Sequence, residues 1–395
     1  MGEAYDVIVV GAGVVGASTA FHLAKLGGGK ICLIDRSQVC SGGTAKSCAI
    51  VRSHYSVPSN TALTLMTLKI FAEFRDWLED PEAESGFVES GYLILAPEGD
   101  LAGRMRANLS MQAGVGAETF EIGAGEARER HPWLELADIA LIGYEPRSGY
   151  ADPYLTTSSF ARAARRKGVT VKTGCRVTGL ATEGGALRGV ETEAGPLFAG
   201  QVALAVGPWT AALGPALGQD LNLEISRHCV LTFEAGAPYE RTLPVVKDLT
   251  TANKMYFRPA SGGVVLAGTG DHGDPVETAE ALDENVGEDF VLHQGAQIAR
   301  RMPAFAEARP TASWVGAYDI TPDWNPVLGP ADAWPNLTLA YGFSGHGFKL
   351  APALGKVLAQ SVLGLETEVD LVPYRASRFA EAALLTGSYG IGSIS

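Results

Sequence analysis

Three glycines near the start of the chain have the spacing of a dinucleotide-binding turn. Gly11, Gly13 and Gly16 follow a short run of β-branched residues at 6–10. The first glycine would permit a tight turn, the second would let the backbone approach a pyrophosphate, and the third would let a helix pack against the strand. The N–H groups at the helix N-terminus would bind the phosphates. Asp35, 19 residues after Gly16, is placed to bind a ribose hydroxyl.

The residues after this acid favour FAD over a nicotinamide dinucleotide. Both cofactors use the glycine turn, but a nicotinamide enzyme more often continues directly into its next strand–helix unit. Residues 36–55 instead form a loop rich in small residues, with Arg52 near its end. An NAD-dependent dehydrogenase and an incidental glycine-rich turn are the alternatives to an FAD site.

The composition limits the classes of partner. The chain has 395 residues, enough for two domains, and 46% of them are hydrophobic. A formal net charge of −13 argues against nucleic acid or an anionic membrane as the main partner. Five widely spaced cysteines favour a reducing compartment without disulfides, and no Cys/His cluster has zinc-finger spacing. The apolar stretch at 7–24 lacks the positive flank of a signal peptide, so we expect a cytoplasmic protein without a membrane span or metal.

Hydrophobic periodicity predicts the elements that would position these residues. A strand at 6–10, a helix at 14–26 and a strand at 30–35 form one βαβ unit. Further helices are expected at 58–78, 118–130, 152–166, 285–302 and 349–365. Further strands are expected at 91–96, 169–172, 187–192, 201–206, 230–233, 254–258, 263–267 and 337–340. The strands beyond residue 221 alternate as in an antiparallel sheet.

Several short motifs are distributed along nearly the whole chain, each occurring once. They are the turn at 11–16, Ile50-Val-Arg-Ser-His-Tyr55, Gly149-Tyr-Ala-Asp-Pro-Tyr154, Val206-Gly-Pro-Trp209, Tyr256-Phe-Arg-Pro259, Tyr318-Asp-Ile-Thr-Pro-Asp323 and Gly342-Phe-Ser-Gly-His-Gly-Phe-Lys349. Each motif is a modest signal, but in this order they resemble the D-amino acid oxidase (DAO) superfamily of FAD enzymes. The resemblance is greatest to the branch of sarcosine oxidase, dimethylglycine oxidase and the sarcosine oxidase β subunit.

This resemblance implies an α/β fold with two discontinuous domains. A Rossmann-like FAD-binding domain of the glutathione-reductase type would comprise residues 1–85, 150–218 and 312–395. An α+β substrate domain with an antiparallel sheet would comprise residues 86–149 and 219–311.

The resemblance also implies where FAD would bind, extended across the first domain. Val177 matches a valine near the adenine, and Gly207 with Trp209 match a segment that covers the cofactor. Residues 44–48 match positions against the flavin ring, and the turn at 345–348 would stabilise the reduced flavin with its backbone donors and helix dipole. The expected cofactor-binding residues are Gly11, Gly13, Gly16, Asp35, Arg36, Thr44, Ala45, Cys48, Val177, Gly207, Trp209, Gly345, His346, Gly347, Phe348 and Lys349.

Four residues are candidates for the substrate pocket. Arg52 and Lys349 match two cations that hold the substrate carboxylate in sarcosine oxidases, one through a bidentate guanidinium and one as a point charge. Tyr256 matches a pocket tyrosine, and His54 could face the same cavity if its segment is extended. The structural alternatives are an ordinary ion pair for each cation, the core for Tyr256, and packing rather than nucleophilic chemistry for Cys48. Neither Tyr256 nor His54 is more than a candidate for a general base.

The sequence departs from monomeric sarcosine oxidase at several places, three of which concern the flavin. Gly316 stands where that enzyme attaches its flavin through a cysteine, so we expect FAD to be bound non-covalently. Ala49 stands where an arginine lies close to the flavin. A lysine that assists oxygen activation is replaced by Leu266 or Val265, which leaves the choice between oxidase and dehydrogenase open.

The expected activity is oxidation of the C–N bond of a small amino acid or N-alkyl amino acid. Hydride transfer to flavin N5 would be followed by hydrolysis of the imine and reoxidation by oxygen, with hydrogen peroxide formed, or by another acceptor. Deamination of a D-amino acid or glycine is one alternative. A β-like subunit that depends on a missing partner is another, and homo-oligomerisation is equally open.

Overall fold

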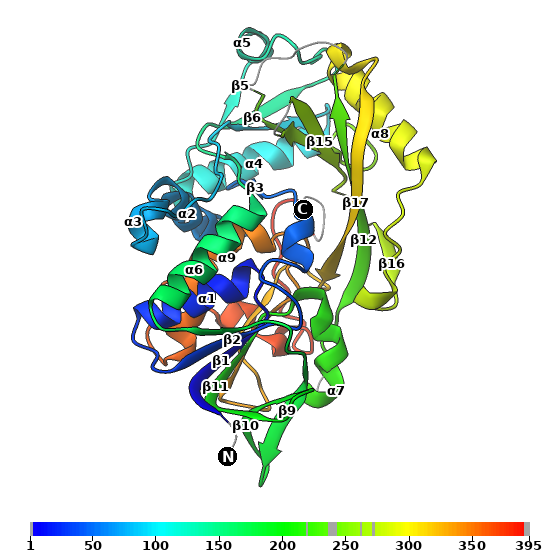
Figure 1. Ribbon diagram of the computed structural model, residues 1–395. Coiled ribbons are helices and arrows are strands. Elements are labelled where there is room, and N and C mark those ends of the chain that lie inside the picture. Colours follow the sequence, from blue (N-terminus) through cyan, green and yellow to red (C-terminus); the bar gives the residue numbers. More distant parts are fainter. Residues whose placement is uncertain (1–2, 219, 236–242, 261–262, 271–272, 391–395) are drawn as a thin grey trace.

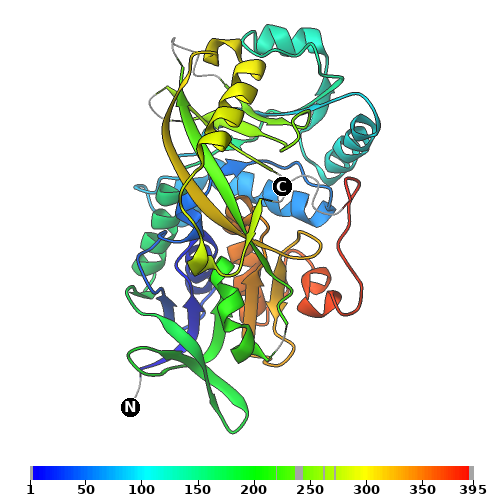
Figure 2. The ribbon, with the colours of Figure 1, turned by 90° about the vertical axis from the view of Figure 1, so that its right-hand side faces the viewer.

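The structure is a computed structural model that describes residues 3–218, 220–235, 243–260, 263–270 and 273–390 (Figure 1). It has two sheet-based lobes, one above the other in Figure 1, and the chain passes between them several times. The colours of Figures 1 and 2 show that each lobe is assembled from separate stretches of the sequence.

The lower lobe is built on an eight-stranded sheet with the order β18-β19-β11-β1-β2-β8, extended by β10 and β9. From β19 to β8 the neighbouring strands are parallel, while β18, β9 and β10 join in antiparallel pairs. The strands are β1 (Ala4–Val10), β2 (Ile31–Ile34), β8 (Thr170–Lys172), β9 (Val177–Glu183), β10 (Ala186–Thr192), β11 (Leu197–Leu204), β18 (Val327–Pro330) and β19 (Leu337–Tyr341).

Three helices cover one face of this sheet: α1 (Val14–Lys25), α6 (Pro153–Arg166) and α9 (Gly347–Val362) (Figure 1). Alternate residues of β1 pack into two cores, with Val7 and Val9 against the helices and Ile8 and Val10 on the opposite face. Such a strand is buried on both faces, which explains its continuous apolar sequence. The first turn of α1 contains no acidic residue, so its positive dipole end is left for an anion.

The upper lobe is a nine-stranded, mostly antiparallel sheet with the order β16-β12-β15-β14-β13-β4-β6-β5, in which β17 pairs with β12. The strands are β4 (Tyr92–Ala96), β5 (Phe120–Ile122), β6 (Leu141–Glu145), β12 (Glu224–Glu234), β13 (Val245–Asp248), β14 (Tyr256–Pro259), β15 (Val264–Gly268), β16 (Asp274–Val276) and β17 (Arg309–Ile320). Helix α8 (Glu288–Arg301) packs on the outer face through Ile298. Helix α4 (Asp100–Val115) packs on part of the inner face.

The remaining elements join the two lobes or cover their edges. They include the two-stranded sheet of β3 (Ile50–Val51) and β7 (Gly149–Tyr150), the helices α2 (Pro58–Ala72), α3 (Phe74–Leu78), α5 (Ala124–Arg130) and α7 (Gly214–Leu217), and the 3-10 helices η1 (Gly43–Lys46) and η2 (Gly207–Leu213). In Figure 2 the C-terminal segment, in red, climbs the side of the lower lobe toward the upper one. Among the described residues, the helices are too short or too polar to cross a bilayer; the cytoplasmic location stays a prediction.

The elements expected from the sequence are largely present, although the helix expected at 58–78 is divided into α2 and α3. The helix expected at 118–130 begins only at Ala124, because residues 120–122 form β5 and pair with β6. The helix α4 and most of the long strand β17 were not expected. The domain division expected at residue 312 falls inside β17, which pairs with β12 from Arg309 to Ile320.

Candidate active site

A cavity of about 490 Å³ lies between the two sheets and contains most of the residues singled out in the sequence. The lower lobe contributes the glycine turn, the loop after β2 and Val177 of β9. The upper sheet contributes Tyr256 and Lys247 from its inner face. A single long cavity therefore joins the expected dinucleotide site to the expected substrate site.

Two of the three glycines in the turn between β1 and α1, Gly11 and Gly16, leave no room for larger side chains. Gly11 has φ +102°, and a Cβ atom there would lie 2.4 Å from the carbonyl oxygen of Ala205. A Cβ atom on Gly16 would lie 1.8 Å from the carbonyl oxygen of Gly11. A Cβ atom on Gly13 would lie 3.0 Å from the hydroxyl of Thr44, and Gly13 borders the cavity itself. Gly16 thus allows α1 to pack closely against the backbone of the turn, whereas Gly13 faces the cavity.

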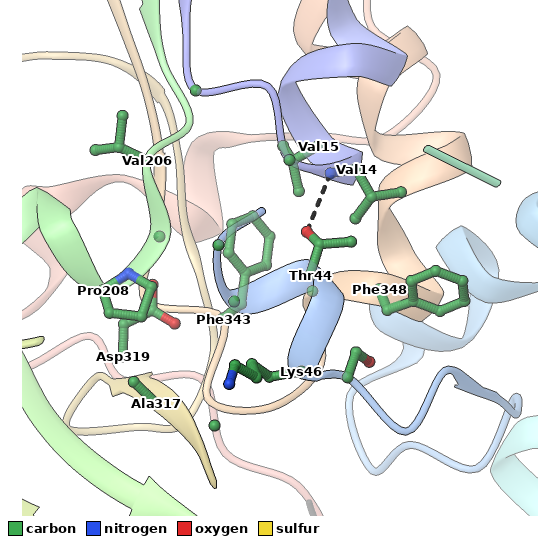
Figure 3. A pocket seen from close by; sticks show the side chains of 18 of the residues that line it. Val14, Val15, Thr44, Lys46, Val206, Pro208, Ala317, Asp319, Phe343 and Phe348 are labelled. Atoms are coloured by element: carbon green, nitrogen blue, oxygen red, sulfur yellow. Dashed lines mark hydrogen bonds between the residues drawn. The ribbon is translucent and has the colours of Figure 1, made fainter. Parts of the chain in front are cut away.

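Polar side chains hold this turn in place. Asp35 accepts hydrogen bonds from the backbone N–H groups of Ala12 at 2.7 Å and Ser37 at 2.7 Å. Thr44, on η1, accepts a hydrogen bond from the N–H of Val14 at 3.1 Å, and Figure 3 shows its side chain pointing at the start of α1. The N-terminal end of α1, where Gly13 and Val14 line the cavity, is thus held facing the place where a phosphate is expected to bind.

The rim near the dinucleotide end is formed by both lobes. The guanidinium of Arg36 lies 4.4 Å from the centroid of the Trp209 ring and pairs with Glu280 at 3.0 Å. Lys46 pairs with Glu284 at 3.3 Å. These ion pairs are partly exposed, so each contributes little to stability, but they bring the segment after β16 to the edge of the cavity.

The second glycine-rich segment reaches the cavity between β19 and α9. Gly345 has φ +82°, and a Cβ atom there would lie 2.5 Å from the ring of Tyr318. Asp319 accepts a hydrogen bond from the N–H of Gly342 at 2.7 Å. Burial raises the pKa of Asp319 to about 6 despite hydrogen bonds that lower it. This close packing brings the N-terminus of α9 to the cavity, with Phe348 in its wall (Figure 3).

Arg52 is buried, with 3% of its surface exposed, and lines the cavity. Its Nη1 donates a hydrogen bond to the carbonyl of His54. Its guanidinium carbon lies 4.9 Å from the ring centroid of Tyr55 and 5.9 Å from that of Tyr92. Its Nη2 is buried and has no hydrogen-bond partner among the described residues. The guanidinium is therefore fixed on one side and has donor capacity left on the other.

Lys349 lies in the first turn of α9 and lines the same cavity. Its Nζ donates a hydrogen bond to the carbonyl of Gly345 at 3.2 Å. Burial lowers the pKa of Lys349 well below its usual value, and repulsion from Arg52 and Lys247 lowers it further. An ammonium in this position gains stability when an anion binds.

Tyr256 and Cys48 meet on the inner face of the upper sheet. The Tyr256 hydroxyl lies 3.0 Å from the sulfur of Cys48, and both line the cavity. Burial raises the pKa of Tyr256 well above its usual value and also raises that of the Cys48 thiol. Both groups therefore remain protonated at neutral pH. Leu266, rather than Val265, lies on this face, where it packs in one cluster with Tyr256.

His54 does not share the cavity of Arg52 but lines a second, smaller one of about 40 Å³. Its Nε2 lies 2.9 Å from the hydroxyl of Tyr389, and its Nδ1 lies 3.5 Å from Glu145. Glu145 also accepts hydrogen bonds from the hydroxyl of Ser148 and the N–H of Ser53, which hold its pKa low although burial alone would raise it. Burial lowers the pKa of His54. The contribution of this residue to the large cavity is its carbonyl, which accepts the hydrogen bond from Arg52.

The structure brings most of the expected site residues together in the large cavity. They are Gly11, Gly13, Asp35, Arg36, Thr44, Cys48, Arg52, Val177, Gly207, Trp209, Tyr256, Gly345, Gly347, Phe348 and Lys349. His346 lines the small cavity instead, with its ring edge-on to Tyr55, and Ala45 lies within η1. Lys247 was not expected at the site, because a single lysine in the short apolar strand β13 matches no motif.

The residues present fit a dinucleotide with a flavin. Gly11 and Gly16 of the glycine turn have no space for a Cβ atom, and the first turn of α1 carries no acid to repel phosphate. The indole Nε1 of Trp209, at the rim, is buried without a hydrogen-bond partner in the described part of the chain. Asp35 and Thr44 hold the turn open toward the cavity, as the dinucleotide motif requires.

Comparisons with known proteins agree with this geometry. FAD-dependent oxidoreductase domain-containing protein 1 of Bos taurus is 28% identical over 420 aligned residues, which cover 95% of this chain and 85% of that protein. Sarcosine oxidase subunit beta of Arthrobacter sp is 26% identical, and the alignment covers 99% of this chain and 95% of that one. The crystal structure of L-proline dehydrogenase from P. horikoshii superimposes with a TM-score of 0.89 at 25% identity, covering 98% of this chain and 100% of that one.

A match to a protein family also extends over most of the chain. Residues 6–361 match the family described as FAD dependent oxidoreductase (DAO). This match confirms the superfamily and the cofactor expected from the sequence, and the structural superposition confirms the fold class. The chain belongs to the DAO family of FAD-dependent oxidoreductases.

Proposed function

We propose that the protein oxidises the C–N bond of a small carboxylate-bearing amine whose carboxylate is bound by Arg52 and Lys349. The observation that carries this proposal is the convergence of these two buried cations on the cavity that also holds the glycine turn. Relatives named for sarcosine oxidation and glycine oxidation support the same class of substrate. FAD, when bound, supplies the two-electron acceptor.

Arg52 is suited to orient the carboxylate because its own position is fixed. Nη1 is held by the carbonyl of His54 and the guanidinium rests against the rings of Tyr55 and Tyr92, so Nη2 keeps one direction. A charge-assisted hydrogen bond to a carboxylate would satisfy this buried donor. Fixing the substrate at its carboxylate restricts the position of the adjacent C–N bond, which is the positioning component of catalysis.

The two cations also determine the protonation state of the amine. A protonated amine would be repelled by Arg52 and Lys349, whereas a neutral amine would not. Binding therefore favours the neutral amine, which is the form that can be oxidised, and the proton leaves to solvent. Tyr256 remains protonated and acts as a hydrogen-bond donor rather than a base, since burial raises its pKa. Water then hydrolyses the imine product to a carbonyl compound and an amine.

The direct test is anaerobic mixing of the yellow holoprotein with N-methyl, cyclic and D-amino acids while the flavin absorption near ~450 nm is followed. Loss of this absorption with one member would establish the reaction class. Readmission of air would then show whether oxygen restores it, which separates an oxidase from a dehydrogenase. A holoprotein that no carboxylate-bearing amine bleaches would contradict the proposal.

Lys349→Gln tests the carboxylate site directly. We expect kcat/KM to fall about 10- to 100-fold, the range for loss of one charge-assisted hydrogen bond, with FAD content retained. Lys356→Gln is the matched control, because Lys356 lies on the same helix but pairs with Glu368 outside the cavity. Equal losses for the two variants would show that Lys349 acts on the helix rather than on the substrate.

We also propose that the chain works in an oligomer or with a further subunit. The similarity to sarcosine oxidase subunit beta, over 99% of this chain, supports a subunit role. Light scattering and mass analysis of protein purified from its native source would detect a co-purifying chain. A fully active monomer would exclude this proposal without affecting the reaction class.

A further inference from the structure

The segment 385–390 packs closely on the chain between β3 and α2. In Figure 2 this part of the chain, in red, climbs from the lower lobe toward the upper one. The N–H of Leu385 donates a hydrogen bond to Asp323 at 3.0 Å. A Cβ atom on Gly387 would lie 2.2 Å from the hydroxyl of Ser56 and 2.5 Å from its carbonyl oxygen. The two segments therefore approach each other too closely for a side chain at Gly387.

Tyr389 of this segment reaches the ring of His54. The hydroxyl of Tyr389 lies 2.9 Å from Nε2 of His54. The Nδ2 atom of Asn108, on α4, lies 3.3 Å from the same nitrogen. The buried side chain of Tyr389 packs in one cluster with Tyr92 and Met105 of the upper lobe. Tyr389 thus connects the upper lobe to the residues that follow β3.

The neighbours of the His54 ring define where its proton lies. The Oδ1 atom of Asn108 accepts a hydrogen bond from Ser388 at 3.2 Å, which orients the amide so that Nδ2 faces the ring. An amide nitrogen only donates, so Nε2 of His54 is an acceptor and the proton of the neutral ring lies on Nδ1. Burial raises the pKa of Tyr389, so its hydroxyl keeps its proton and donates to Nε2 as well. Nδ1 faces Glu145 of β6 at 3.5 Å.

The position of His54 determines the position of Arg52. The carbonyl of His54 accepts the hydrogen bond from Nη1 of Arg52. The ring of the same residue is enclosed by Glu145 on one side and by Asn108 and Tyr389 on the other. The buried Nη2 of Arg52, which has no partner among the described residues, is the donor available to a carboxylate. Its direction therefore depends on groups that lie behind the cavity wall.

We propose that Tyr389 is a positioning residue of the carboxylate site, where its hydrogen bond to His54 holds the carbonyl that fixes Arg52. In the part of the chain that the structure describes, Tyr389 lines the small cavity and not the large one, so it acts on the substrate only through Arg52. This inference rests on the proposed function, since it concerns the same carboxylate site. It adds the segment 385–390 to the parts of the chain that determine substrate affinity.

The first test removes the hydroxyl and keeps the ring. Binding of acetate to the holoprotein can be followed by the change in flavin absorption, which requires no turnover. We expect Tyr389→Phe to raise the dissociation constant of acetate about 3- to 10-fold, the range for one neutral hydrogen bond, with FAD content retained. An unchanged dissociation constant would overturn the inference.

Tyr374→Phe is the matched control for this variant. Tyr374 is also buried, but its hydroxyl bonds to Ser59 at 2.6 Å and to Asn60 at 2.8 Å. We expect Tyr374→Phe to lower the free energy of unfolding by a similar amount to Tyr389→Phe and to leave acetate binding unchanged. Equal rises in the dissociation constant for the two variants would overturn the inference, because they would show a general loosening of the fold.

A double-mutant cycle shows whether Tyr389 acts through Arg52. In an Arg52→Gln background, Tyr389→Phe should change the dissociation constant of acetate by less than about 2-fold, because the group on which it acts is gone. A rise as large as in the wild-type background would overturn the inference, since Tyr389 would then act on the site by another route.

The last test uses the substrate itself. The amine that reduces the flavin fastest is compared with its carboxamide, which lacks the charge that Arg52 is proposed to bind. Tyr389→Phe should lower kcat/KM about 3- to 10-fold for the acid and less than about 2-fold for the amide. Equal losses would overturn the inference. If no amine reduces the flavin, yet Tyr389→Phe weakens acetate binding only when Arg52 is present, the proposed function fails and the inference stands.

Discussion

Substitution of single glycines by alanine separates the cost of a positive φ angle from the cost of a steric clash at the new Cβ atom. At Gly27, φ is +82° and no atom lies within 4 Å of the new Cβ, so alanine there meets only the conformational cost. That cost is about 1 to 2 kcal/mol for a left-handed residue. At Gly11, φ is +102° and the Cβ would also lie 2.4 Å from the carbonyl oxygen of Ala205. Moving backbone to relieve such a contact adds about 1 to 3 kcal/mol, so we expect Gly11→Ala to cost about 2 to 5 kcal/mol in total.

Gly13→Ala should behave differently from both. Its Cβ would meet only the Thr44 hydroxyl, at 3.0 Å, and φ at this position is not positive. We expect the free energy of unfolding of the apoprotein to change by less than about 1 kcal/mol, the ordinary effect of a peripheral substitution. The affinity for FAD should nevertheless fall, because this residue faces the phosphate site.

Urea unfolding of the apoprotein and titration with FAD measure the two effects independently. Gly27→Ala serves as the control, since this exposed residue lies at the far end of α1 and should retain full FAD affinity. Equal losses of stability in Gly11→Ala and Gly27→Ala would refute the packing argument. Undiminished FAD affinity in Gly13→Ala would refute the assignment of the phosphate site.

Two further predictions concern buried charges. The side chains of Arg378 and Asp323 are both fully buried and are joined by two hydrogen bonds. Arg378→Met should therefore lower the free energy of unfolding, measured by urea titration, by about 3 to 5 kcal/mol. Arg375→Met, which removes an exposed ion pair, should lower it by less than about 1 kcal/mol in the same titration. Asp319 has a pKa raised to about 6 in the folded protein against a usual value of 3.8. The acid is protonated in both states below pH 4, ionises only in the unfolded state between pH 4 and 6, and so reduces stability by about 3 kcal/mol as the pH rises through that window. The stability of Asp319→Asn relative to wild type should therefore increase from pH 4 to pH 7 in apoprotein melts, and a constant difference would contradict the burial argument.

The arrangement of the candidate cofactor residues could be predicted from the sequence more completely than that of the candidate substrate residues, because the two sets are encoded differently. Gly11, Gly13, Gly16 and Asp35 belong to one βαβ unit, so their relative positions follow from local geometry. Every contact within that unit is set by short-range turns and strand pairing. A pattern of residue types at fixed spacing can therefore identify it.

His54 shows why such reasoning fails beyond a single unit. Two residues after Arg52, it would share a face with it in a regular extended strand. The chain after β3 is not a strand, however, and the ring is held by Glu145 of β6 and by Tyr389 near the C-terminus. These partners are distant in the sequence, so no local pattern could have placed the ring.

Lys247 is a residue of the cavity wall that no sequence motif indicated. It lies in a short strand whose neighbours Val245 and Val246 suggest only burial, and a lysine is rarely placed in such a strand without a reason. Its position in the cavity wall becomes apparent only in the folded sheet, where β13 pairs with β4 and β14 and the cavity lies against its inner face. On the proposed function, the residues that bind the substrate lie where the two lobes meet, whereas the glycine turn of the candidate dinucleotide site lies within a single βαβ unit. On the proposed function, substitutions that alter substrate choice should therefore fall on the inner face of the upper sheet, around Tyr256, and leave the glycine turn unchanged.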